Sequence, residues 1–185
     1  MSVPSLETDR LVLKAITKED AHFYHQNFVD YEVIKNLAAG VPWPYPENGI
    51  SDFIEEVILP SYESNERWIW GLFLKDNLQE IIGVIDLWKE GHPEHRGFWL
   101  AKKHWNKGLM TEANFPVIDY AFNTLGFKEL IFSNALGNIA SRKIKEKTGA
   151  RFLRIEKGDF VDSTFTEREI WSLDKRDWSR FKSSS

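Results

Sequence analysis

The segment from His104 to Ala113 carries the strongest chemical signal in the sequence, because it joins an expected strand to an expected long helix. The first turn of a helix presents unpaired backbone N–H groups and the positive end of the helix dipole, which together bind phosphate oxygens. Gly108 has no side chain, so the backbone there could approach an anion closely. The basic residues nearby are Lys102, Lys103, His104 and Lys107. The segment therefore indicates a phosphate-binding loop, and a solvated connection that merely starts a helix is the alternative.

Composition narrows the class of protein. The chain has 185 residues, of which 42% are hydrophobic and 28% charged, so we expect a single globular domain over residues 1–185. It contains no cysteine, which excludes a disulfide framework, a thiolate metal site and a cysteine nucleophile. The net charge of −4 argues against general nucleic-acid binding. Because neither a signal peptide nor a membrane-spanning run is evident, we expect a cytoplasmic protein that contacts no membrane.

Alternating strands and helices are expected to position this loop. Apolar patterning predicts strands at 11–16, 68–74, 81–88, 97–101, 130–133, 152–155 and 165–173. Helices are expected at 17–27, 31–37, 51–59, 108–124 and 138–147. Hairpin strands followed by strand–helix alternation predict an α/β fold of the α+β kind. We expect a mixed, mostly antiparallel twisted sheet of about six to seven strands, with helices on both faces.

Pro116 tests where the long helix begins. If the helix starts near Gly108, Pro116 lies two turns inside it, where it lacks an N–H for the carbonyl of Glu112. This costs about 3 kcal/mol and predicts a kink or a local opening. A later start, near Glu112, would instead place Pro116 in a tolerated first turn.

The loop resembles the W-G-K-G-Y-A-T-E-A segment of the GNAT (general N-acetyltransferase) superfamily, in the branch of the ribosomal-protein N-terminal acetyltransferases. The matching residues are Trp105, Lys107, Gly108, Thr111, Glu112 and Ala113. Asn106 and Met110 depart from the pattern, because they replace a usual Gly and a usual small residue. The resemblance continues in Glu7–Leu13 with Asp20 and Ala21, Gly97–Leu100, Asp119–Phe122, Asn138, Ser141 and Glu146–Gly149.

The resemblance implies a site for acetyl-CoA as co-substrate, without a metal. In the family, backbone amides of the loop hold the coenzyme A pyrophosphate, a role that would fall to Trp105, Asn106, Lys107, Gly108, Leu109, Met110 and Thr111. The strands at 97–101 and 130–133 are expected to be a splayed central pair, whose free edge binds the pantetheine arm like an added strand. Main-chain groups near Leu100 and Lys102 would bond that arm.

The start of the helix predicted at 138–147 is the candidate site for the reacting end of the ligand. Asn138 and Ser141 share one helix face. The resemblance implies that Asn138 touches the arm or the phosphate end, and an N-cap is its other reading. It also implies that Ser141 protonates the departing thiolate, whereas a small packing residue is the alternative. Many family members use a Tyr four residues later; here that residue is Lys145.

An ammonium acceptor must lose a proton before it attacks, and three side chains are candidate bases. Asp86 lies in an otherwise apolar strand, where burial would raise its pKa. Glu94 and His95 precede the strand at 97–101, and the pKa of a His lies near the required pH. Direct attack with a water relay, and no dedicated base, is the fourth possibility.

We therefore expect an enzyme that moves an acetyl group from acetyl-CoA to a primary amine by direct attack in a ternary complex. The first hypothesis for the acceptor is the N-terminus of a protein or peptide. The second is a small amine, such as a polyamine, an amino sugar or an amino acid. A third hypothesis is a noncatalytic acyl-CoA-binding module. The protein is expected to be a monomer or a homodimer.

Overall fold

The computed structural model describes residues 3–90 and 94–185. Its strands are β1 (Leu6–Glu7), β2 (Leu11–Lys14), β3 (Arg67–Leu74), β4 (Asn77–Trp88), β5 (Arg96–Leu100), β6 (Glu129–Ala135), β7 (Arg151–Lys157) and β8 (Glu167–Asp174). Its α-helices are α1 (Ala21–Phe28), α2 (Tyr31–Ile34), α3 (Gly49–Phe53), α4 (Leu59–Ser64), α5 (Leu109–Asn123), α6 (Ile139–Glu146) and α7 (Lys175–Ser183). Short 3₁₀ turns are η1 (Lys18–Asp20) and η3 (Lys102–His104), and η2 (Ile54–Ile58) is a π-helical segment between α3 and α4.

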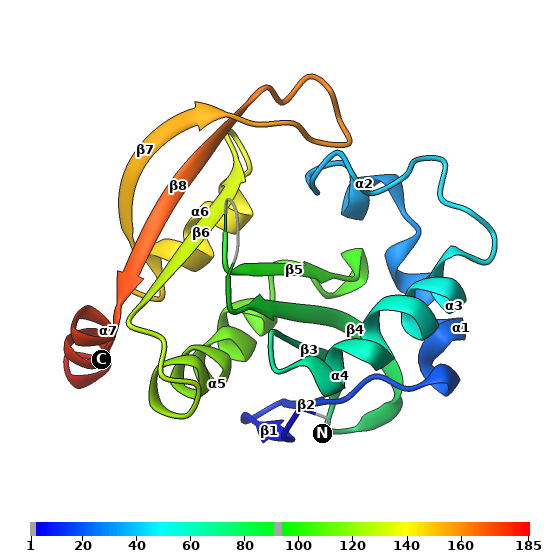
Figure 1. Cartoon of the computed structure of the whole chain (residues 1–185), viewed down its shortest axis with the longest axis horizontal. Coiled ribbons are helices and arrows are strands. Elements are labelled where there is room, and N and C mark those ends of the chain that lie inside the picture. The colour runs from blue at the N-terminus through cyan, green and yellow to red at the C-terminus, as the bar shows by residue number, and fades with distance from the viewer. Residues whose placement is uncertain (1–2, 91–93) are drawn as a thin grey trace.

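The strands form two hydrogen-bonded sheets, so the predicted single sheet is divided. One sheet has the order β1-β2-β3-β4-β5 and the other β6-β8-β7, and every ladder among the described residues is antiparallel. The two sheets meet where the backbone N–H of His95 donates to the carbonyl of Ile131 at 2.8 Å. From there β5 and β6 diverge (Figure 1). The splayed pair and the α+β fold class are confirmed, and the divided sheet follows from the splay.

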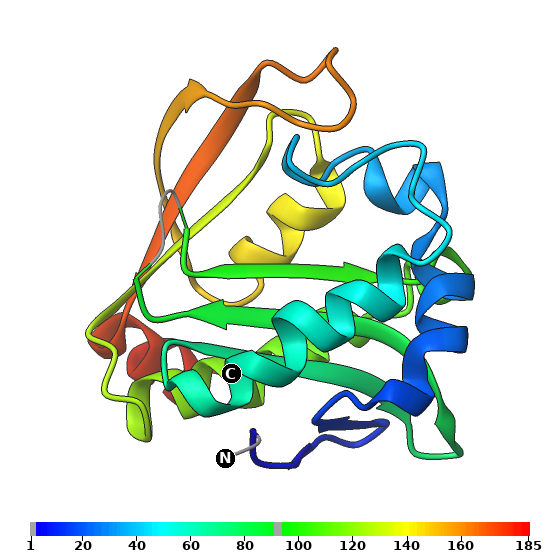
Figure 2. The same ribbon diagram turned by 45° about the vertical axis from the view of Figure 1, so that its right-hand side comes forward.

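The five-stranded sheet carries helices on both faces. Figure 2 shows α3, η2 and α4 crossing one face, with α5 behind the other. Trp70 of β3 is fully buried, and its ring meets Tyr120 of α5 edge-on at 5.7 Å. The core on both sides of the sheet therefore holds β4 and β5 in place, and the site lies at the open edge of β5.

Local sequence signals account for most boundaries. Thr17 and Asp20 form the expected capping box ahead of α1. The predicted hairpin around 75–77 is confirmed by the pairing of β3 with β4. The helix predicted at 31–37 ends at Ile34, because the chain turns away to pair with the connection between β7 and β8. Sequence patterning misses β1, since two residues are too few to show alternation.

Helix α5 begins at Leu109, directly after Gly108, so the alternative of a start near Glu112 is wrong. Pro116 therefore lies inside the helix. The backbone stays helical through it, and no opening interrupts α5. A smaller bend at Pro116 stays a prediction.

Candidate active site

The loop before α5 turns its backbone in the left-handed conformation at two residues. Gly108 has φ 75° and is the N-cap of α5, and Asn106 has φ 60°. Asn tolerates this region better than any other residue with a side chain except Asp, which explains why Asn106 can replace the usual Gly. A Cβ at Gly108 would find its nearest atom, Arg10 Nη2, at 3.6 Å. The loop therefore leaves open space in front of the first turn of α5, as an anion cradle requires.

This loop lines a groove with a volume of about 520 Å³. The groove is also lined by β5, by the first two turns of α6, by residues after α2 and by the connection between β7 and β8. The predicted site residues along it are Leu100, Trp105, Asn106, Gly108, Leu109, Met110, Thr111, Asn138 and Ser141. Lys102 and Lys107, also predicted, do not line it. The structure thus brings together residues that are up to 41 positions apart in the sequence.

The open edge of β5 faces this groove. Gly97, Trp99 and Ala101 point their main-chain groups toward β4, as the bond from the Ala101 N–H to the Ile82 carbonyl (2.8 Å) and the register show. In an antiparallel ladder the alternate residues point the other way. The main-chain groups of Phe98 and Leu100 therefore face the gap where β6 has diverged, and an extended ligand could bond to them.

Two main-chain groups expected to bond the ligand are already engaged within the protein. The carbonyl of Leu100 accepts the indole N–H of Trp105 at 2.7 Å. The carbonyl of Lys102 accepts the backbone N–H of Trp105 at 3.1 Å. The amide of Leu100 thus remains as the donor toward the gap. His104 also lines the groove, and its Nε2 is buried without a hydrogen-bond partner in the described part of the chain.

The start of α6 places Ser141 on the groove wall. The Asn138 side chain accepts from the Ser141 N–H at 3.2 Å, so Asn138 is the N-cap that its residue type predicts. One turn further, Lys145 is 1% exposed, and its Nζ donates to Ser141 Oγ at 2.9 Å. Burial first, and then the charge of Arg96, lower the pKa of Lys145 to about 7. The sequence identified Lys145 as the residue in place of the family's Tyr, but it did not predict the burial of this amine.

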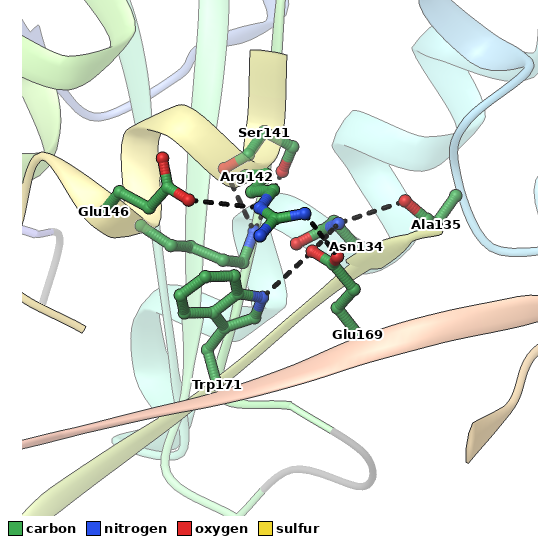
Figure 3. A network of polar contacts seen from close by, with 8 residues as sticks. Asn134, Ala135, Ser141, Arg142, Glu146, Glu169 and Trp171 are labelled. Atoms are coloured by element: carbon green, nitrogen blue, oxygen red, sulfur yellow. Dashed lines mark hydrogen bonds and ion pairs between the residues drawn. The ribbon is translucent and has the colours of Figure 1, made fainter. Parts of the chain in front are cut away.

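Acidic and basic groups surround this amine. Burial raises the pKa of Glu94, which lines the groove and accepts hydrogen bonds from the N–H and Oγ of Ser133. On the other side lies the buried Glu169, on which the side chains of Asn134, Arg142 and Trp171 converge (Figure 3). These groups set the charge balance around the Ser141 hydroxyl.

The three candidate bases occupy different places. Asp86 pairs with Arg67, and it does not line the groove. Burial raises its pKa, and the ion pair with Arg67 opposes that rise. His95 also lies outside the groove lining, and its Nδ1 accepts the backbone N–H of Ile131 at 2.9 Å. The geometry therefore favours Glu94 over the other two as the group that meets an acceptor.

The far end of the groove is bridged by two loops, residues 35–39 and 159–162, which we call the roof. The N–H groups of Val161 and Asp162 donate to the carbonyls of Leu37 and Lys35, and Ala39 donates to Asp159, at 2.9–3.2 Å. Both loops line the groove, and Figure 2 shows them meeting above β5. The roof therefore lines the same groove as Glu94 and Ser141.

Glu112 ties the N-terminal strands to the helix that begins at the loop. It accepts hydrogen bonds from Thr8 Oγ1 (2.6 Å), from the Arg10 N–H (2.9 Å) and from Arg10 Nε (2.7 Å). Burial alone would raise the pKa of Glu112, but these bonds outweigh it and lower the pKa below the ordinary value of 4.5. Glu112 thus contributes stability above its unfolded pKa, and this contribution is lost as the pH falls through the lower folded pKa.

We expect Glu112→Gln to destabilise the fold by about 1–3 kcal/mol at pH 7, because charge-assisted bonds are lost. The difference from the wild type should shrink as the pH falls below 4.5, the ordinary pKa of the group. Urea unfolding at pH 7 and pH 3.5 measures both. Glu66→Gln, which breaks an exposed pair with Lys89, is the control and should cost under about 1 kcal/mol. A pH-independent difference would show that Glu112 acts by packing alone.

Within residues 3–90 and 94–185, no group of three or more His, Asp or Glu side chains could hold a metal ion. Over the same residues, no helix has the length and apolar character needed to cross a membrane.

Known proteins resemble this chain over most of its length. The family model for the acetyltransferase (GNAT) domain matches residues 10–151. A Bacillus subtilis protein named "Putative ribosomal N-acetyltransferase YdaF" is 32% identical over 142 residues, which are 72% of this chain and 76% of that protein. The ribosomal-protein-S5-alanine acetyltransferase of Vibrio fischeri has a TM-score of 0.79 at 17% identity, covering 95% of this chain and 99% of that one. RimJ of Mycobacterium smegmatis, in complex with CoA-disulfide, has a TM-score of 0.79 at 13% identity, covering 97% and 93%.

Proposed function

Because the chain belongs to the acetyltransferase (GNAT) domain family, as an N-acetyltransferase, we propose that it acetylates the α-amino group at the N-terminus of a protein, with acetyl-CoA as donor. The observation that carries the proposal is the groove itself. The first turn of α5, the open edge of β5 and the Ser141 hydroxyl all line it. The relative named for ribosomal N-acetylation, at 32% identity, supports this acceptor class.

The residues present fit acetyl-CoA. The loop 105–111 offers its backbone amides and a left-handed Gly108 to the pyrophosphate. The buried, unpartnered Nε2 of His104 offers one more polar atom beside that loop. The amides of Phe98 and Leu100 offer an edge to the amide-bearing arm. When bound, acetyl-CoA supplies an activated thioester carbonyl.

Two side chains that line the groove can act as proton acceptor and proton donor. Glu94, whose pKa is raised by burial, accepts the proton of the incoming ammonium. Ser141, which takes a hydrogen bond from Lys145, presents its own hydrogen to the leaving sulfur. Both groups line the same groove, so attack and departure need only positioning.

The roof favours an acceptor that is thin at its reacting end. A protein N-terminus is a single extended chain end, which can pass the roof while the rest of the protein stays outside. A small free amine could also pass the bridge between residues 35–39 and 159–162, and it is the second candidate.

An acceptor panel separates these candidates. Thiol release from acetyl-CoA would be measured with peptides that begin with Ala, Ser, Thr or Met, with N-terminally blocked copies of each, and with polyamines, amino sugars and amino acids. Turnover of free peptides, absent from blocked ones, is the expected result. Turnover of small amines alone would overturn the N-terminal proposal. Acetyl-CoA binding without thiol release from any amine would identify a noncatalytic binding module.

A further inference from the structure

Lys145 is a titratable amine buried in the protein interior, where Ser141 is its one hydrogen-bond partner among the described residues. Its Nζ donates to Ser141 Oγ at 2.9 Å and lies 3.5 Å from the Ser141 carbonyl. No ion pair within the described part of the chain includes Lys145. Its helix neighbours Arg142 and Lys143 are exposed, so Lys145 differs from them in being buried. Burying an amine without a carboxylate partner costs several kcal/mol. A leucine or methionine would fill the space without that cost, so packing alone does not explain the residue.

The charges that face Lys145 come from β5, from the connection before it and from β8. Arg96 of β5 is 3% exposed, stacks 3.8 Å over the ring of Phe132, and has no hydrogen-bond partner for its three nitrogens within the described residues. Glu94, just before β5, and Glu169 of β8 carry the opposing negative charges. The positive charge of Arg96 favours loss of a proton from Lys145, and the two carboxylates favour its retention.

The hydrogen bond from Lys145 Nζ to Ser141 Oγ leaves the serine hydrogen free to be donated. Lys145 does not line the groove, whereas Ser141 does, so the amine lies behind the hydroxyl. Because Ser141 Oγ accepts from Nζ, its own hydrogen is free to be donated on the groove side. We propose that Lys145 is a positioning residue that supplies protons to Ser141 and, through it, to the sulfur that departs during acetyl transfer. This inference rests on the proposed acetyl transfer.

The proposed transfer conserves electron pairs and protons. The acceptor nitrogen forms the C–N bond to the acetyl carbon, and the C–S bond breaks with its electron pair on sulfur. The Ser141 hydrogen moves to sulfur as a Lys145 proton moves to Ser141 Oγ, so that Lys145 is left neutral. The acceptor ammonium loses two protons: Glu94 takes the first and passes it to water before the attack, and it takes the second as the amide forms. Water then returns one proton to Lys145 and removes one from Glu94.

The first test needs no acceptor. The thiolate absorbance of bound CoA would be titrated in the wild type and in Lys145→Met, each against the protein alone. We expect the bound thiol to ionise about one pH unit lower in the wild type, because the hydrogen bond from Ser141 and the nearby ammonium stabilise the thiolate. Lys145→Gln, which removes the charge but keeps a polar side chain, is the second variant should Lys145→Met fail to fold. Equal thiol titrations in folded variants would overturn the proposal, whatever the acceptor is.

The second test uses an acceptor from the panel. Wild-type kcat should fall as the pH rises through the Lys145 pKa, since only the protonated amine supplies a proton. Lys145→Met and Lys145→Arg should lower kcat roughly 10- to 100-fold, lose this dependence and leave the KM for acetyl-CoA within about threefold. Arg96→Met should move the fall to higher pH, because it removes a positive charge beside the amine.

Three results would contradict the relay. One is an unchanged pH dependence in Lys145→Met, which would leave the amine a structural residue. Another is a loss confined to the KM for acetyl-CoA. The third is an acetyl group trapped on Ser141 and detected by mass spectrometry, which would make the serine a nucleophile activated by Lys145. The absence of any amine acceptor would sink the proposed function alone, because the thiol titration would still report on Lys145.

Discussion

Gly108→Asp should weaken acetyl-CoA binding on the order of 100-fold while the protein stays folded. The substitution adds a carboxylate at the N-cap of α5, where the loop turns toward the groove. Like charges about 4 Å apart repel by about 4 kcal/mol at an effective dielectric constant of 20, and screening reduces this. Isothermal titration calorimetry with acetyl-CoA measures the loss.

Gly126→Asp is the matched control. Gly126 has φ 77°, close to that of Gly108, and a Cβ there would meet nothing within 4 Å. Both variants therefore carry the same left-handed strain, but residue 126 lies after the other end of α5. The control should keep the wild-type affinity. Full affinity in folded Gly108→Asp would place the pyrophosphate elsewhere.

Ser141→Ala should lower kcat roughly 10- to 100-fold and leave acetyl-CoA affinity within about threefold. Protonation of the leaving sulfur matters in the transition state rather than in the bound ground state, so turnover should suffer more than binding. Steady-state kinetics with an acceptor from the panel, together with calorimetry, separates the two effects.

The control for this variant is Ser179→Ala, which removes an exposed hydroxyl that also bonds within its own helix. It should change neither kcat nor affinity. Wild-type turnover in Ser141→Ala would identify Ser141 as a packing residue. The proposed proton transfer from Lys145 through Ser141 to the leaving sulfur would then be wrong.

The sequence predicted the elements well because period and capping are local properties. Alternation located β3 and β4, and the Thr17–Asp20 capping box located the start of α1. The loop before α5 was found for the same reason, since its glycine and the start of the helix are adjacent in the sequence.

The burial of Lys145 was not predicted, because a lysine among basic residues resembles a solvated helix face. The available signal was its spacing, four residues after Ser141, which puts both on one face of α6. The burial itself comes from Glu94, Arg96 and Glu169, which belong to other elements. The pairing of the two roof loops was equally hidden, since irregular segments show no period.

The roof has a consequence for how this protein can change over evolutionary time. Its hydrogen bonds join main-chain atoms only, and every residue except proline carries both groups. Side chains on residues 35–39 and 159–162 can therefore vary without breaking the bridge. Single substitutions can therefore change the side chains at the proposed acceptor entrance, while the proposed acetyl-CoA loop and α6 keep their sequence. A library randomised at these nine positions should keep acetyl-CoA binding in most members and shift the amine that is acetylated in some.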